Sequence, residues 1–189
     1  PNGDSGLLAV SVDAFRDYQL KHAWVWEHQA LTRARFCAGD PAVGQRFEAI
    51  RNEILCQERE LAKLREEVVA MRQKMLDAHA SRSATEFDLK HDPGGIIDVE
   101  FIVQYLVLGH AHRHPRLTGN LGNIALLAMA ADLGLIPAGL AEGARRAYRE
   151  YRRLQHLKRL NANPKSRIDR SAVRQEIDAV CLLWREVLG

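Results

Sequence analysis

Cysteine is scarce in this sequence. The 189 residues include three, Cys37, Cys56 and Cys181, which lie far apart and form no CxxC pair and no Cys/His ligand spacing. A disulfide framework or a structural zinc site requires such pairs or spacings, so the sequence argues against both. We expect three reduced and mostly buried thiols, as in a cytosolic protein.

A long apolar run is also missing. The most apolar stretch, Ile96 to Gly109, is too short to span a bilayer and is interrupted by Asp98, Glu100 and Gln104. No basic segment followed by an apolar one opens the chain, which argues against a secretion signal. We therefore expect a cytoplasmic protein without a membrane partner.

Neither sign of charge dominates. Lys and Arg number 27 against 24 Asp and Glu, a net charge of +3. Binding to the phosphate backbone of nucleic acids usually needs a stronger positive bias, so we expect no nucleic-acid partner. A helical RNA-binding module is a minor alternative, which steep salt-dependent binding to arbitrary RNA would reveal.

Strand patterns are nearly absent after residue 12, where LLAVSV gives a last weak alternation before Ser11 caps a first helix. The pattern predicts an all-α helical bundle over residues 21–189, after a weak strand signal near the start of the chain. Helices are expected over 23–37, ending at Gly39, and over 41–79, 96–112, 120–133, 138–160 and 171–188.

Two of these helices have distinctive patterns. Residues 41–79 begin with the N-cap Asp40 and with Pro41, and contain no helix-breaking residue after Gly44, so one long helix and two nearly collinear ones are both allowed. Residues 96–112 are apolar in every direction except at Glu100 and Gln104, which predicts a central buried helix.

Histidines and arginines form two other clusters. His110 and His114 are four residues apart, but no acid or thiol nearby completes a metal site, so we expect no metal there. Residues 145–159 carry many arginines on one helix, which makes a phosphate-bearing or acidic partner an alternative to a purely structural role. An apolar stripe through the same helix includes Tyr151, which predicts that this tyrosine is a core residue.

The stretch FDLKHDPGGIIDVEF, residues 87–101, concentrates the unusual chemistry. As a helix start, Asp92 would cap the helix, Pro93 would take its first position and Asp98 would sit at its positive end. That interpretation leaves Glu100 unexplained on a buried helix, where a carboxylate needs a cation. It also leaves Asp88 and Lys90 without a role. The Gly94–Gly95 pair could bring backbone N–H groups close to a phosphate.

FDLKHDPGGIIDVEFIVQYLVL closely resembles the signature of the glutamine synthetase adenylyltransferase family. PNGDSGLLAVSVDAFRDYQ resembles the stretch after the catalytic strand of its nucleotidyltransferase fold, and AWVWEHQALTRARFCAGD resembles the next helix. The likeness covers most of residues 1 to about 110, and it implies that residues 1–20 are the C-terminal remnant of an α/β nucleotidyltransferase domain. The chain begins at Pro1, which resembles the proline that ends that strand, so we expect a piece of a longer protein.

The resemblance implies an enzyme that transfers AMP from ATP to a tyrosine of glutamine synthetase and also removes it. The family carries two such units, and the DVEF form of the signature resembles the C-terminal, adenylylating one. Three carboxylates hold Mg²⁺ in this chemistry, and the resemblance places all of them upstream of Pro1. We therefore expect no catalytic residue, no metal and no bound ATP in this chain, and no AMP transfer by the chain alone.

Two roles then remain open for these residues. In the first, Arg33, Arg35, Lys90 and the Gly94–Gly95 turn face the nucleotide, ordered by acids that pair with the cations or hold a metal: Asp88, Asp98 and Glu100. In the second, the helical part is an interaction module, binding glutamine synthetase or the PII signal protein through residues 145–159. A related uridylyltransferase-type unit is a further alternative.

Overall fold

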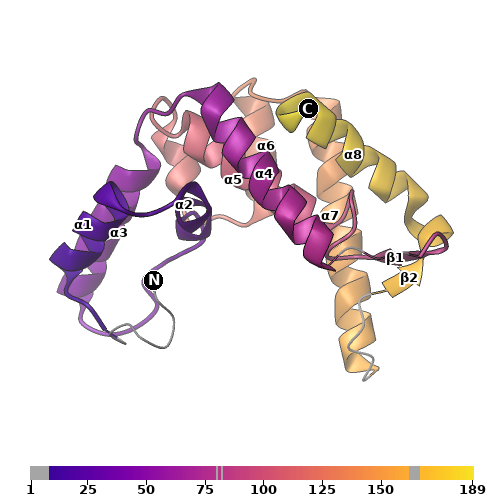
Figure 1. Ribbon diagram of the computed structural model, residues 1–189, viewed down its shortest axis with the longest axis horizontal. Helices are drawn as coiled ribbons and strands as arrows, with labels where there is room; N and C mark the ends of the chain where they lie inside the picture. Colours follow the sequence, from indigo (N-terminus) through magenta and orange to yellow (C-terminus); the bar gives the residue numbers. More distant parts are fainter. Residues whose placement is uncertain (1–8, 80, 82, 162–166) are drawn as a thin grey trace.

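The computed structural model describes residues 9–79, 81, 83–161 and 167–189. Helices dominate these residues, as the all-α prediction requires, and Figure 1 shows their arrangement. In chain order the helices are α1 Val12–Lys21, α2 Val25–Leu31, α3 Pro41–Leu55, α4 Leu61–His79, α5 Ile96–His110, α6 Asn123–Asp132, α7 Ala138–Leu160 and α8 Arg174–Leu188. Two short 3₁₀ helices, η2 Pro115–Thr118 and η3 Arg170–Val173, lie before α6 and α8.

Helix α5 is the centre of the bundle, as predicted. Its side chains are buried on all sides except at Glu100, Gln104 and His110. It contacts α2, α4, α6, α7 and α8, so nearly every face of the apolar cylinder is removed from water. Gln104 accepts a hydrogen bond of 2.9 Å from Gln29 of α2, which satisfies part of its polar strip.

Helix α7 packs along both α6 and α8. Small residues allow the close approach: Ala144 and Ala147 are buried, and a Cβ at Gly143 would lie 3.3 Å from Ala179 of α8. Tyr151 is fully buried, which confirms its predicted core position, and its hydroxyl donates to the carbonyl of Gly94 at 2.9 Å.

Helices α1 and α3 form a separate arm at one end of the molecule (Figure 1). Their N-caps are the predicted ones: Ser11 accepts from the N–H of Ala14, and Asp40 accepts from Ala42. Phe15 and Phe47 join the two helices, with ring centroids 5.7 Å apart.

The stretch 41–79 forms two helices, and they are not collinear, because α4 turns away from α3 at residues 56–60 (Figure 1). Arg59 explains the break. Its guanidinium donates to the carbonyls of Ile54 at 2.9 Å, Gln57 at 3.2 Å and Leu108 at 3.3 Å, and so satisfies the open end of α3.

Helix α2 corrects a second expectation, since it ends at Leu31 and not near Gly39. The buried guanidinium of Arg51 accounts for the early end, because it binds the carbonyls of Leu31 at 3.1 Å and Thr32 at 2.8 Å. Helices α6 and α8 each begin three residues later than expected, at Asn123 and Arg174, and η3 precedes α8.

Two further expectations need correction. A pair of three-residue strands was not predicted: β1, Glu86–Asp88, runs antiparallel to β2, Arg167–Asp169. The strand expected in LLAVSV falls partly outside the described residues, and its described part, residues 9–12, contains no strand. All three cysteines are free, but they are not mostly buried as expected: Cys37 is exposed, because the chain after α2 leaves the core, and Cys56 and Cys181 are partly exposed. No helix in the described part of the chain is long and apolar enough to cross a bilayer.

Candidate functional site

Three arginines line a hollow of about 370 Å³ between the end of α2, the start of α6 and the side of α7. We call it the arginine hollow. Its lining residues are Thr32, Arg33, Arg35, Asn120, Leu121, Gly122, Asn123, Ile124, Tyr148 and Arg152. None of these ten residues is acidic, so its surface favours a negatively charged ligand.

One acid approaches this hollow from the buried helix α5. Glu100 accepts a hydrogen bond of 2.8 Å from Arg33 and one of 3.4 Å from the hydroxyl of Tyr148. Asn123 donates to the same hydroxyl at 3.0 Å. The half-buried carboxylate on the central helix therefore has a cationic partner, and that partner is one of the predicted cations.

Tyr148 acts as a donor in this network. Burial, and then the negative charge of Glu100, raise the pKa of the Tyr148 hydroxyl above its ordinary value. The phenol stays protonated at neutral pH, and it orients Glu100 toward Arg33.

The two loops of the arginine hollow are tied together by one buried side chain. Arg51, about 1% exposed, donates to Thr118 of η2 at 2.7 Å as well as to Leu31 and Thr32. Burial lowers the pKa of Arg51, and the three carbonyls supply the acceptors that a buried guanidinium needs. The early end of α2 thus turns Arg33 and Arg35 outward and fixes them beside α6.

The positive end of α6 completes the arginine hollow. Gly122 is the N-cap residue, and no side chain caps it by a hydrogen bond. The first-turn N–H groups of a helix attract anions, an effect that adds to the charge of neighbouring arginines. The arrangement of guanidinium groups, amide side chains and a helix N-terminus suits a phosphate group.

The Asp-Pro-Gly-Gly turn has a different architecture. The N-cap of α5 is Gly95, so the predictions that Asp92 caps the helix and that Pro93 is its first residue are wrong. The carboxylate of Asp92, about 1% exposed, instead accepts from the N–H groups of Ser81 at 2.6 Å and Asp88 at 2.9 Å. Asp92 therefore fixes the loop before the helix and is not available to cap it.

Asp98 lies at the positive end of α5, as predicted, but its partner is unexpected. It accepts from Arg72 of α4 at 2.5 Å and from the N–H of Gly94 at 2.6 Å. Burial raises the pKa of Asp98, and Arg72 opposes that shift. The N–H of Gly95 donates to the carbonyl of Asp92 at 3.0 Å, so both glycine N–H groups are engaged within the turn.

Asp88 and Lys90 lie at the edge of the same turn. Asp88 accepts from the N–H groups of Lys90 at 2.8 Å and His91 at 3.1 Å, and so orders the backbone. The side chain of Lys90 is exposed. The predicted residues thus form two groups, with Arg33, Arg35 and Glu100 at the arginine hollow and the others in or beside the turn.

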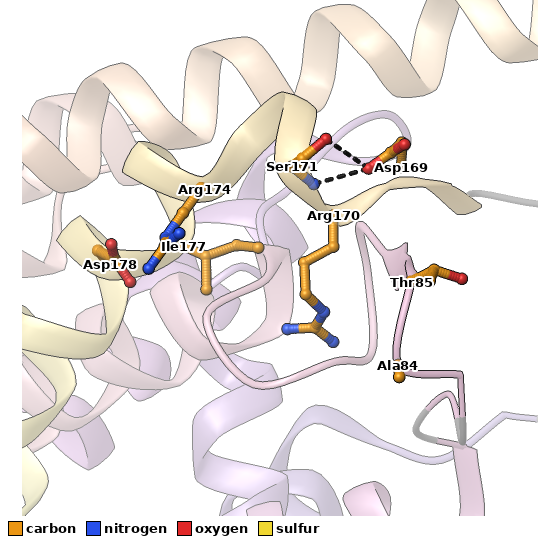
Figure 2. Close-up of a pocket in the computed structure, with 8 residues that line it drawn as sticks. All are labelled: Ala84, Thr85, Asp169, Arg170, Ser171, Arg174, Ile177 and Asp178. Carbon is orange, nitrogen blue, oxygen red and sulfur yellow. Dashed lines mark hydrogen bonds between the residues drawn. The ribbon is translucent and has the colours of Figure 1, made fainter.

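A second hollow, of about 510 Å³, adjoins β1 and β2 (Figure 2). Arg170 lies at its centre, with its guanidinium 3.6 Å from Asp92 and 5.4 Å from the ring centroid of Phe87. Ser171 donates from both its N–H and its hydroxyl to Asp169, as the dashed lines in Figure 2 show. Arg170 therefore braces the turn through Asp92.

Some residues of the arginine hollow were missed by sequence reasoning. Arg152 and Tyr148 belong to the arginine-rich helix, for which a phosphate-bearing partner was only an alternative and which was not connected with Arg33. Asn123 gave no signal. Within the residues that the structure describes, His110 and His114 included, no three His, Cys, Asp or Glu side chains are grouped to hold a metal ion.

Comparison with known proteins gives two family matches. Residues 1–50 match the family model described as glutamate-ammonia ligase adenylyltransferase, and residues 59–178 match the model described as GlnD PII-uridylyltransferase. The boundary between the matches falls close to the connection between α3 and α4.

The similar curated proteins share one name, bifunctional glutamine synthetase adenylyltransferase/adenylyl-removing enzyme. The protein of Aromatoleum aromaticum is 59% identical over 189 residues, covering 100% of this chain and 20% of the relative. That of Chromobacterium violaceum is 59% identical over 187 residues, 99% of this chain and 20% of the relative. That of Nitrosomonas europaea is 53% identical over 203 residues, 100% of this chain and 22% of the relative. The chain spans about a fifth of their length.

Proposed function

Since the chain belongs to the glutamine synthetase adenylyltransferase family, we propose that it is the part of such an enzyme that binds nucleotide phosphates during AMP transfer. The relatives' name covers both the attachment and the removal of AMP. The substrate would be a tyrosine of glutamine synthetase, and the AMP donor would be ATP. The complete reaction belongs to the longer protein, of which this chain is about a fifth.

The arginine hollow carries this proposal. Arg33, Arg35 and Arg152 surround a space next to the N-terminus of α6, with no acid among the lining residues. A guanidinium group can donate two parallel hydrogen bonds to two oxygens of one phosphate. During transfer a phosphoryl group also gains negative charge, which such donors stabilise. Glu100 holds Arg33 in place without entering the lining of the hollow.

The metal ions of the reaction would be held elsewhere in the longer protein. The described residues offer no grouping of acids suited to Mg²⁺, while the arginine hollow suits phosphate oxygens. When bound, Mg²⁺ would neutralise charge on the phosphates and orient them. The residues of this chain would bind the phosphates from another side and exclude water from them.

Steady-state kinetics of the full-length enzyme test the proposal. Replacing Arg35 or Arg152 by alanine removes one charged hydrogen bond to phosphate, so KM for ATP in adenylylation should rise by about tenfold or more. Arg146→Ala is the control, because Arg146 is also an arginine of α7 but is exposed and does not line the hollow. Equal effects of all three substitutions would refute the phosphate site.

A second candidate function rests on the far end of α7. This end extends away from the bundle (Figure 1), and its side chains include the exposed Leu157, Leu160 and Arg159. Apolar groups exposed beside cations are typical of a surface that meets an acidic partner. Glutamine synthetase and the PII signal protein are the candidate partners, the latter because of the uridylyltransferase match.

Binding measurements separate the two functions. The charge reversal Arg159→Glu should weaken binding of the full-length enzyme to immobilised glutamine synthetase or PII protein, and leave its affinity for ATP unchanged. Unchanged binding to both proteins would exclude this surface as the interface.

A further inference from the structure

A third hollow, of about 330 Å³, lies between α4 and α8 beside the start of α5. We call it the α4–α8 hollow. Figure 1 shows the two helices on the same side of the bundle. The lining residues are Val69, Arg72, Gln73, Leu76, Pro93, Asp98, Cys181, Trp184 and Arg185. Most of its surface is apolar, with a few charged and polar side chains contributed by α4, α5 and α8, as in sites that bind small molecules.

Arg72 lines the α4–α8 hollow, and its buried guanidinium is incompletely bonded. Its Nε donates to Asp98 at 2.5 Å, and Nη2 donates to the carbonyls of His91 at 2.8 Å and Asp92 at 3.5 Å. Nη1 is buried and has no hydrogen-bond partner among the described residues. The residue as a whole is 2% exposed.

An unpartnered buried donor is unfavourable, because it has lost its hydrogen bonds to water without replacement. Most buried polar groups have partners, so an exception calls for a physical reason. Of the hollows described above, the α4–α8 hollow is the one that Arg72 lines. An acceptor bound there would supply the missing hydrogen bond after a small shift of neighbouring side chains such as the exposed Gln73.

The charges on the lining residues indicate what kind of acceptor fits. Arg72 is balanced by Asp98, to which it is directly bonded. Arg185, which is exposed, adds a second positive charge, and its Nε donates to the carbonyl of Cys181 at 3.4 Å. One negative charge on a ligand would therefore neutralise the lining. The apolar walls formed by Val69, Leu76 and Trp184 would cover the rest of that ligand.

We propose that the α4–α8 hollow binds a small carboxylate with an apolar body, whose carboxyl group bonds Arg72 Nη1 and faces Arg185. The ligand would bridge α4 and α8 at the start of α5. The site is separate from the arginine hollow, with which it shares no lining residue.

Tryptophan fluorescence of the 189-residue chain tests the proposal. The chain has three tryptophans, and replacing the exposed Trp24 and Trp26 by phenylalanine leaves Trp184, which lines the hollow, as the single reporter. Titration with octanoate should give a saturable change in emission. Octanamide has the same body without the charge, and should bind about tenfold more weakly or worse. Circular dichroism checks that each variant is folded.

Two substitutions locate the binding. Val69→Phe should fill the hollow and abolish the octanoate response, and Arg185→Gln should weaken octanoate several-fold while leaving octanamide unchanged. Both substitutions leave the buried Arg72–Asp98 pair in place, so the test does not depend on a variant of Arg72 that fails to fold. Equal affinities for octanoate and octanamide, an unchanged response in Val69→Phe, or no saturable response would each overturn the proposal.

Discussion

Gly94 occupies a position in the turn before α5 that no other residue can take without cost. Its φ is +86°, and a Cβ there would lie 2.9 Å from Ile177 Cγ2 and 3.0 Å from both Cys181 Sγ and the carbonyl oxygen of Ile177. Its carbonyl also accepts the hydroxyl of buried Tyr151 at 2.9 Å. Conformation and packing both require glycine, so its presence in the signature has a structural cause.

Gly94→Ala should therefore destabilise the chain by about 2 kcal/mol or more, combining an unfavourable φ with overpacking against α8. Urea denaturation measures the free energy of unfolding. Gly139→Ala is the matched control, because nothing lies within 4 Å of its Cβ position and the residue is helical. It should be neutral or slightly stabilising. Similar losses for both variants would contradict the role of the turn.

Lys90 and Glu100 separate function from stability. Lys90 is exposed and has no ion pair within the part of the chain that the structure describes, whereas Glu100 is bonded to Arg33 and Tyr148. Lys90→Ala should change the free energy of unfolding by less than about 0.5 kcal/mol. If Lys90 faces the nucleotide, the same substitution in the full-length enzyme lowers adenylylation several-fold. Full activity of Lys90→Ala would show that Lys90 is not part of the site.

Glu100→Ala, in contrast, should lower both the free energy of unfolding and the adenylylation rate, because it releases Arg33 and leaves the Tyr148 hydroxyl with one partner fewer.

At the scale of elements, a buried histidine links α1, α2 and the α3–α4 connection. His28 Nε2 lies 3.0 Å from the carbonyl of Gln19, and Arg59 Nη2 lies 3.3 Å from His28 Nδ1. Arg59 in turn binds the carbonyls at the end of α3. The arrangement fits a neutral imidazole that donates to Gln19 and accepts from Arg59.

Acid should loosen this junction. Burial lowers the pKa of His28 below the ordinary 6.5, while the carbonyl of Gln19 opposes the shift and Arg59 adds to it. Between the folded and unfolded pKa values the unfolded chain binds more protons, so stability is lost as pH falls below about 6.5. The free energy of unfolding of wild type and of His28→Gln, measured as a function of pH, should therefore become more similar as the pH falls. Burial also lowers the pKa of His110, which the variant retains, so the difference isolates His28. A constant difference between the two proteins over this pH range would exclude His28 as the source of the acid sensitivity.

The elements also show which features a sequence can specify. Helices α3 and α7 begin where predicted, because Asp40, Pro41 and Pro137 act locally. The end of α2 depends on Arg51, twenty residues away from Leu31, and β1 depends on a partner strand about eighty residues later. Three-residue strands carry no periodic signal, so their pairing follows from the packing of α7 and α8.

The arginine hollow was likewise only partly predictable from the sequence. Glu100 was recognisable because a carboxylate on an apolar helix needs a cation, and Arg33 is that cation. Arg152 and the N-terminus of α6 also lie at the arginine hollow, and their position there depends on how α6 and α7 pack, which the sequence does not specify. Asp92 was misassigned, because its partners are backbone N–H groups, which a sequence does not distinguish. The division of the chain at residue 20 stays a prediction, and any such division crosses the contact between α1 and α3.

At the scale of the molecule, the division of labour leads to a last prediction. The described residues contain a phosphate-suited hollow but no grouping of acids for metal ions, and AMP transfer with Mg²⁺ requires both. The purified 189-residue chain, incubated with glutamine synthetase, Mg²⁺ and radiolabelled ATP, should therefore attach no AMP, while the full-length enzyme labels its substrate in parallel. If the arginine hollow binds phosphate as proposed, the chain should still bind ATP weakly, in a salt-dependent manner that Arg152→Ala diminishes. Labelling of glutamine synthetase by the chain alone would show that it holds a complete catalytic centre.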